Sequence, residues 1–194
     1  EWAVLAQNIL PQWLAVQPLS EFSASGLTNS VELPKQITLA VFDHAALQAC
    51  CQGIVELLAH VGVECLVQAY TFAEFQLRAR QNELTEQLVL TSLNLDDNRA
   101  SSAFRWFYAN SVLQQCLSEQ TQTWLQQKLN HIRQHNETSE YLAALEPIAT
   151  ALIYQHQLLP LFHHKQTLNF EGMLKGVAIS CWGWPLIKDV WTAD

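Results

Sequence analysis

Three polar residues, Asn94, Asp96 and Asp97, follow directly on an apolar segment at residues 88–93. That segment has the pattern of a buried strand, and open α/β sheets bind their ligands beyond the carboxyl ends of the strands. The amide and the two carboxylates could therefore hold a small molecule through hydrogen bonds. The alternative is a structural role, in which Asp96 or Asp97 caps the helix that follows.

Two adjacent histidines, His163 and His164, form a second candidate site. Neighbouring side chains on a strand point to opposite faces, so this pair does not easily hold one metal ion. With no cysteine or acidic pair nearby, we expect neither a metal site nor a cofactor. A hydrogen bond from one histidine to a ligand remains open.

Two tryptophans near the end of the chain, Trp182 and Trp184, are the third candidate. They share one face if their segment is extended, and Gly183 between them lets another backbone approach closely. Aromatic faces bury a large area at low entropic cost, so the pair could stack on a sugar or an apolar ligand. Core packing is the competing interpretation.

Catalysis finds little support in the sequence. It contains no G-x-S-x-G, HExxH, P-loop or dinucleotide-binding glycine motif. Cys181 and His163 could act as thiol and base, but a cysteine on a strand is by default a buried one. We therefore expect a binding protein and not an enzyme.

The charge of the chain argues against direct DNA binding. Ten Lys and Arg residues are scattered through a sequence of net charge −8, whereas a DNA-binding surface needs a basic patch to neutralise phosphates. No apolar run approaches the roughly 18 residues of a membrane span. The predicted partner is therefore a small molecule, with neither DNA nor a membrane bound by this chain itself.

Five cysteines are present, an odd number without a CxxC pair: Cys50, Cys51, Cys65, Cys116 and Cys181. Three of them continue apolar stripes, where a free cysteine behaves as a small hydrophobe. We expect Cys50, Cys51 and Cys65 to be reduced and largely buried. Reduced thiols favour a cytoplasmic location over the periplasm.

The elements that position these residues follow a regular order from residue 37. Residues 37–42, 63–69 and 88–93 read as strands, and the first of them is apolar on both faces. Apolar residues between 47 and 61 recur on one helical face that ends at Gly62, and Thr71 with Glu74 forms a capping-box pattern. The sequence therefore predicts an α/β fold with a parallel βαβαβ core.

The flanking segments complete the prediction. Residues 1–16 read as a short helix and residues 18–34 as a linker, so we divide the chain into 1–35 and 36–194. Helices are predicted over 99–117 and 118–134, the second with Ser118 as its N-cap. Thr138 or Ser139 should cap a third helix, and Pro147 should kink it or mark its true beginning. Residues 158–170 and 177–181 should be extended and form a return segment.

The stretch 159–191 resembles the end of family-5 solute-binding proteins. Its matching features are a proline-led strand at 159–162, the pair Gly176-Val177 and an aromatic closing motif from Gly183 to Trp191. Upstream, the Val61-Gly62-Val63 turn and the helix of Phe72 to Phe75 keep the order of that family's C-terminal lobe. The cysteine content, the compact lobe and the string at 163–167 are most similar to the SgrR-type transcriptional regulators.

This resemblance implies a periplasmic-binding-protein-like lobe that senses a ligand and controls a separate N-terminal domain, through which alone DNA would be bound. The ligand would be a small metabolite, such as a sugar phosphate in the response to sugar-phosphate stress, bound in a cleft between two lobes. The family's receptors place an acidic residue near Asp96 and Asp97 to pair with a ligand amine. The alternative is the C-terminal lobe of a periplasmic oligopeptide- or dipeptide-binding protein of an ABC importer. Residues 92–98 depart from the loop of those receptors, which puts peptide binding in doubt.

Overall fold

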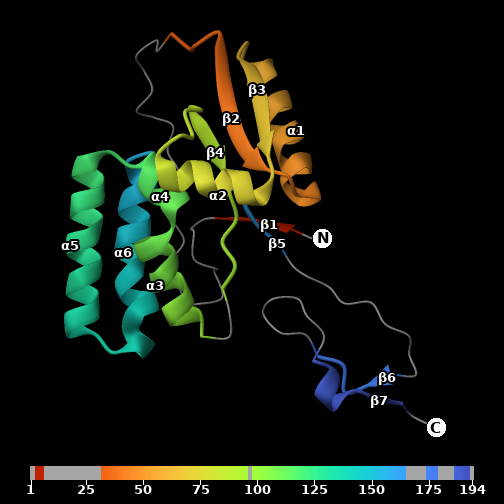
Figure 1. The fold of residues 1–194 in the computed structure, drawn as a ribbon, viewed down its shortest axis with the longest axis vertical. Helices are drawn as coiled ribbons and strands as arrows, with labels where there is room; N and C mark the ends of the chain where they lie inside the picture. Colours follow the sequence, from red (N-terminus) through yellow and green to blue (C-terminus); the bar gives the residue numbers. More distant parts are fainter. Residues whose placement is uncertain (1–2, 7–31, 96–97, 165–173, 179–185, 193–194) are drawn as a thin grey trace. The chain divides into compact units, whose positions relative to one another are not determined.

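A computed structural model describes residues 3–6, 32–95, 98–164, 174–178 and 186–192 (Figure 1). The chain divides into two compact units. We call residues 21–92 and 109–122 the sheet unit, and residues 1–20, 93–108 and 123–194 the helical unit. Each is described by itself.

The sheet unit contains three parallel strands: β2 (Gln36–Phe42), β3 (Glu64–Tyr70) and β4 (Leu88–Leu90). Their order is β3-β2-β4, and Leu39 of β2 lies opposite both Val67 and Leu88. Helix α1 (Ala45–His60) joins β2 to β3, and α2 (Phe72–Gln81) joins β3 to β4. The parallel βαβαβ core predicted from the sequence is confirmed.

The two helices cover opposite faces of this sheet, because successive side chains of a strand alternate between faces. Ala40 and Tyr70 pack with Phe75 and Ala79 of α2 in one buried cluster. Val41 and its neighbours on the other face lie against α1. The prediction that β2 is buried on both faces is confirmed, since its central residues are fully buried.

Local capping sets the ends of both helices. Gly62 has a positive φ of 79° just after α1, and its N–H donates to the Ala59 carbonyl, as the predicted stop requires. The Thr71 hydroxyl accepts from the Glu74 N–H at 3.2 Å and begins α2. Glu74 does not complete a capping box, because its carboxylate accepts from Arg78 instead.

The helix predicted over residues 99–117 is in fact two helices, α3 (Arg99–Ala109) and α4 (Ser111–Cys116). The break falls at Asn110, whose side-chain oxygen accepts from the Leu113 N–H at 3.1 Å. Asparagine competes in this way with the main-chain bonds of a continuous helix. The single-helix prediction is therefore wrong at this point.

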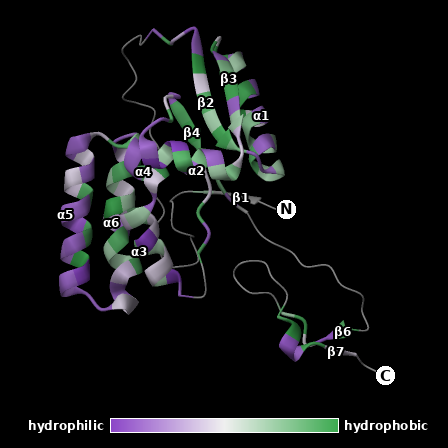
Figure 2. Ribbon diagram, viewed as in Figure 1, coloured by the Kyte–Doolittle hydropathy of each residue, from purple (hydrophilic) through white to green (hydrophobic). Residues whose placement is uncertain are grey.

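The helical unit is built from α3, α5 (Glu119–His135) and α6 (Tyr141–Tyr154), which lie side by side in Figure 1. The Phe104 ring of α3 packs on Tyr141 with centroids 4.8 Å apart. Figure 2 shows α6 as the more apolar and α5 as the more polar helix. The residues buried at their centre are leucine, isoleucine and phenylalanine: Phe107, Leu125, Leu129, Leu145, Leu152 and Ile153.

The starts of α5 and α6 test two predicted caps. The Ser118 hydroxyl accepts from the Thr121 N–H at 3.2 Å, which confirms the cap of α5. Before α6, Thr138 and Ser139 lie inside a short 3-10 helix, and Glu137 with Glu140 forms the capping box. A carboxylate satisfies the first N–H groups there, so the predicted Thr or Ser cap is wrong. Pro147 lies inside α6 and does not mark its beginning.

The N-terminal segment is extended where a helix was predicted. Strand β1 (Ala3–Leu5) pairs antiparallel with β5 (Phe162–His164), and Val4 lies opposite His163. Main-chain bonds to a distant segment replace the local helical pattern, so the prediction is wrong for these residues. The rest of that helix lies outside the described residues, and the division at residue 35 stays a prediction.

The described C-terminal part consists of β6 (Leu174–Lys175), a 3-10 turn at Ile187–Asp189 and β7 (Trp191–Thr192). Lys175 lies opposite Trp191 in this antiparallel pair. The extended segment predicted at 158–170 is confirmed at β5. In the segment predicted at 177–181, residues 177–178 form no strand and the others lie outside the described part. No described helix is both long and apolar enough to cross a membrane.

Candidate ligand-binding site

The carboxyl ends of β2 and β3 meet at one edge of the sheet, where ligands of open α/β sheets bind. The Asp43 N–H donates to the Tyr70 carbonyl at 2.7 Å and joins the two strand ends. The Asp43 carboxylate accepts from the Gln48 amide at 2.6 Å. Polar groups of two strands and the start of α1 are thus held together at this edge.

The first turn of α1 lies at the same edge and carries no side-chain cap. Its N-cap residue, His44, is exposed and makes no side-chain cap, and no acidic residue occupies the first turn. The first N–H groups of a helix have no partner within the helix, and the helix dipole favours negative charge there. The start of α1 can therefore accept an anionic oxygen, whereas the start of α2 is capped by Thr71.

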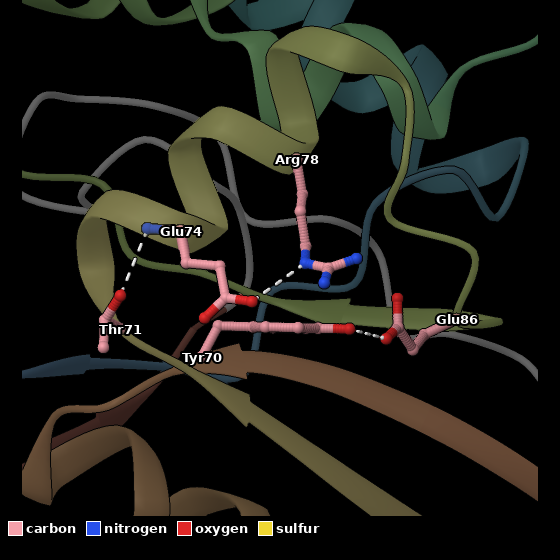
Figure 3. A network of polar contacts seen from close by, with 5 residues as sticks. All are labelled: Tyr70, Thr71, Glu74, Arg78 and Glu86. Carbon is pink, nitrogen blue, oxygen red and sulfur yellow. Dashed lines mark hydrogen bonds and ion pairs between the residues drawn. The ribbon is translucent and has the colours of Figure 1, made fainter.

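A network of polar side chains fixes α2 to the end of β3 (Figure 3). The Tyr70 hydroxyl donates to the Glu86 carboxylate at 2.5 Å. The Arg78 guanidinium lies over the Tyr70 ring, 4.9 Å from its centroid, and its Nε donates to Glu74 at 3.2 Å. The second Glu86 oxygen is buried and has no hydrogen-bond partner.

The environment of Tyr70 keeps its hydroxyl neutral. Burial raises the pKa of Tyr70 above its ordinary value near 10, and the hydrogen bond and negative charge of Glu86 raise it further. A hydroxyl with a raised pKa is a hydrogen-bond donor and not a general base near neutral pH. The network therefore positions α2 on the end of β3 and does not serve as a general base.

We expect Tyr70→Phe to lower the free energy of unfolding by about 1–2 kcal/mol, because the half-buried Glu86 carboxylate would lose the hydrogen bond from the Tyr70 hydroxyl. Chemical denaturation measures this loss, and Tyr108→Phe, at an exposed tyrosine, should change stability by less than about 0.5 kcal/mol. The raised pKa of Tyr70 gives a second readout. The stabilisation that the neutral Tyr70 hydroxyl contributes is fully present below about pH 10, and it is lost as the pH rises through the folded-state pKa. If the Tyr70→Phe protein has the same free energy of unfolding as the parent, and loses the same amount of it at alkaline pH, this assignment is contradicted.

The predicted cluster after β4 is only partly described. Asn94 is exposed, and its main-chain carbonyl accepts from the Ser102 hydroxyl at 3.5 Å. Asp96 and Asp97 lie outside the described residues. At the start of α3 the Asn98 side chain accepts from the Ser101 N–H at 3.3 Å. The capping alternative offered for the aspartates stays a prediction.

The predicted histidines belong to the helical unit. His163 and His164 lie on β5, as the extended prediction required, and His163 is half-buried. The side chain of His164 is not described, and Trp182 and Trp184 lie outside the described residues. The part of the chain that the structure describes contains no group of three metal-ligating side chains.

The cysteines of the sheet unit match their prediction in most respects. Cys51 and Cys65 are buried, whereas Cys50 is half-buried and Cys116 is exposed. All four are free thiols, and burial raises the pKa of Cys50, Cys51 and Cys65. A raised thiol pKa lowers the thiolate fraction, so these cysteines are poor nucleophiles. Cys181 lies outside the described residues.

The described surface contains two hollows that the sequence did not predict. A hollow of about 430 Å³ lies between α5 and α6 in the helical unit, with Trp124, Lys128 and His131 on its α5 side. Their spacing of four and three residues was the available signal, since it places them on one helical face. A second hollow, of about 550 Å³, lies between α1 and β3 in the sheet unit.

No family model matches the chain. It is 26% identical over 190 residues to the HTH-type transcriptional regulator SgrR of Yersinia pestis, covering 96% of this chain and 30% of that protein. The SgrR of Pectobacterium atrosepticum is also 26% identical over 190 residues, covering 97% and 31%. The chain thus spans about 30% of the length of these relatives.

Solved structures resemble the chain in fold. The periplasmic murein tripeptide-binding protein MppA, in its unliganded open form, gives a TM-score of 0.61 at 14% identity, covering 90% of this chain and 36% of that one. A dipeptide-binding protein from Pseudoalteromonas sp. SM9913, in complex with Met-Leu, gives 0.62 at 14% identity, covering 98% and 40%. The fold is therefore periplasmic-binding-protein-like.

Proposed function

Because this chain is homologous to SgrR-type transcriptional regulators over 96% of its length, we propose that it is the ligand-sensing part of such a regulator. The observation that carries the proposal is the combination of this homology with the fold of a solute-binding protein. A regulator that contains a binding-protein lobe has a means of coupling a small molecule to DNA. We place the protein in the cytoplasm, where its free thiols would stay reduced.

DNA contact would belong to another part of the polypeptide. The relatives are more than three times as long as this chain, and the chain itself has a net charge of −8. A separate domain would therefore supply the basic surface. The ligand acts by binding one state of the two-lobed domain more tightly than the other, which is how a ligand shifts a conformational equilibrium.

The proposed ligand is a sugar phosphate held in a cleft between lobes. The start of α1 supports an anionic group, because its first N–H groups are uncapped at the carboxyl edge of the sheet. The residues predicted to contact the ligand remain part of the proposal: Asn94, Asp96, Asp97, His163, His164, Trp182 and Trp184.

Peptide binding is the second candidate function, and the fold favours it as well. The solved relatives in fold bind a murein tripeptide or a dipeptide. Under this alternative the chain would be the C-terminal lobe of a periplasmic receptor of an ABC importer. Such a receptor binds peptides and has no affinity for a specific DNA sequence.

The full-length protein that carries this chain tests the proposal. Bound duplexes are selected from a random DNA pool, and the affinity for the selected duplex is measured with and without glucose 6-phosphate. We expect the sugar phosphate to change DNA affinity about tenfold, within the usual range of allosteric coupling, while glucose and inorganic phosphate do not. If no DNA sequence is selected and the protein binds Met-Leu tightly, the proposal is overturned in favour of the periplasmic peptide receptor.

A matched pair of variants examines the role of α1 in the same protein. Ala46→Asp adds a negative charge to the exposed first turn of α1, and Ala73→Asp adds the same charge to the first turn of α2. Both changes suit a helix N-terminus, so both proteins should fold. We expect only Ala46→Asp to weaken glucose 6-phosphate binding, by about tenfold in calorimetry. Equal effects of the two variants would remove α1 from the proposed site.

A further inference from the structure

Strand β3 is at one end of the three-stranded sheet and pairs only with β2 among the described strands. Exposed edge strands usually carry lysine, proline or a bulge that blocks pairing with another chain. The sequence of β3, ECLVQAY, contains neither lysine nor proline, and its only charged residue is Glu64. Within the described part of the chain, the outer edge of β3 therefore lacks the usual protection against a further strand.

Main-chain hydrogen bonds show which groups face that edge. The Glu64 N–H donates to the Lys35 carbonyl, and the Tyr70 carbonyl accepts from the Asp43 N–H, so both residues direct these groups toward β2. Main-chain groups alternate in direction along a strand, which makes residues 64, 66, 68 and 70 the inward set. Cys65, Val67 and Ala69 consequently direct their N–H and carbonyl groups to the outer edge.

Apolar side chains are exposed along the same strand. Leu66 and Val67 have 45% and 41% of their surface exposed, on opposite faces of the sheet. The hollow between α1 and β3 is lined by Val67 and Ala69 on the strand and by Val55 and Gln52 on the helix. An edge that no described strand pairs with and an apolar hollow therefore adjoin in one place.

We propose that β3 pairs with β3 of a second copy of this chain, antiparallel and centred on Val67. In this register Val67 lies opposite the partner's Val67. Cys65 of each copy lies opposite the partner's Ala69. All of these are outward-directed residues, so they form hydrogen-bonded pairs with about six main-chain bonds in all. The result is a continuous six-stranded sheet with a two-fold axis through its centre.

Self-complementarity is the reason to choose a second copy over another occupant. The one charged residue, Glu64, faces the partner's Tyr70, so no like charges are opposed within the strands. Leu66 faces the partner's Gln68 on the other face. A two-fold axis perpendicular to the sheet keeps each face on its own side, so the two hollows beside α1 join over the central valines.

Sedimentation velocity of the 194-residue chain over a roughly hundredfold range of concentration measures the association. We expect a monomer–dimer equilibrium that tightens with added salt, because each copy carries a charge of −8 and salt screens the repulsion. Val67→Lys should raise the dissociation constant at least about a hundredfold, since two lysines would then oppose each other at the centre. Leu77→Lys, at a site on α2 with 55% exposure, is the control for an exposed apolar residue changed to lysine and should leave it unchanged.

Residue-resolved hydrogen exchange gives a second readout in the unmodified chain. The amides of Leu66 and Gln68 should be protected at every concentration because they bond to β2. The amides of Cys65, Val67 and Ala69 should become protected only as the dimer forms. Protection of these three at all concentrations would mean that another part of the same chain covers the edge, and the proposal would be dropped. A chain that stays monomeric, or a dimer that survives Val67→Lys, overturns it equally.

Discussion

Phe75→Ala should lower the free energy of unfolding of the sheet unit by about 3–5 kcal/mol, the usual loss for a buried phenylalanine. Phe75 is completely buried in the cluster between α2 and the sheet. Its ring centroid lies 5.6 Å from that of Phe42 and 6.5 Å from that of Tyr70. Truncation removes the apolar contacts of three elements and leaves a cavity that rigid neighbours cannot fill.

Urea denaturation monitored by circular dichroism measures this loss, with Phe72→Ala as the matched control. Phe72 lies in the same helix, is 60% exposed and contacts Phe42 only edge-on, at 5.3 Å between centroids. We expect the control to lose about 1 kcal/mol, the contribution of one aromatic pair. Phe75→Leu keeps most of the volume and should fall between the two. Equal losses for Phe72→Ala and Phe75→Ala would mean that α2 packs on the sheet by a different face.

The isolated chain should bind glucose 6-phosphate only near millimolar affinity, whereas the full-length protein should bind it about a thousandfold more tightly. This expectation rests on the proposed cleft between two lobes. Sites that hold small molecules well bury most of the ligand surface. A single lobe would supply part of the contacts, and each 1.4 kcal/mol lost costs about a factor of ten in affinity.

Isothermal titration calorimetry on both proteins compares these affinities, and a mobility shift on the selected duplex accompanies it. The isolated chain should retard no DNA, because its net charge is −8 and its ten basic residues are scattered. Micromolar binding of glucose 6-phosphate by the isolated chain would place the whole site within these residues. The idea of a cleft completed by another lobe would then be wrong.

The sequence alone determined the core of the sheet unit. Residues 37–90 contain every signal of a βαβαβ unit: an apolar strand, a one-sided helix that ends at Gly62, and a helix that begins at Thr71. These signals are local, because backbone geometry and side-chain periodicity act over a few residues. For the same reason the Ser118 cap could be predicted. The resemblance to SgrR-type regulators was also available in the sequence, and the homology found over the chain agrees with it.

Other features depended on contacts between residues far apart in the chain. Ala3–Leu5 has a sequence that also suits a helix, and its pairing with Phe162–His164 decides for a strand. Asn110 could have continued a helix, but its side chain instead accepts from Leu113 and begins a new one.

Burial along β3 is likewise a tertiary property. Val67 and Ala69 continue an apolar alternation, yet both are exposed because β3 is the outer strand among those described. The same holds for Tyr70 and Glu86, sixteen residues apart, whose hydrogen bond exists only because β3, α2 and the segment before β4 meet. A pattern of residue types fixes which face of a strand is apolar. Only the arrangement of the strands decides whether that face, or that edge, is covered, because burial depends on neighbours that local periodicity does not specify.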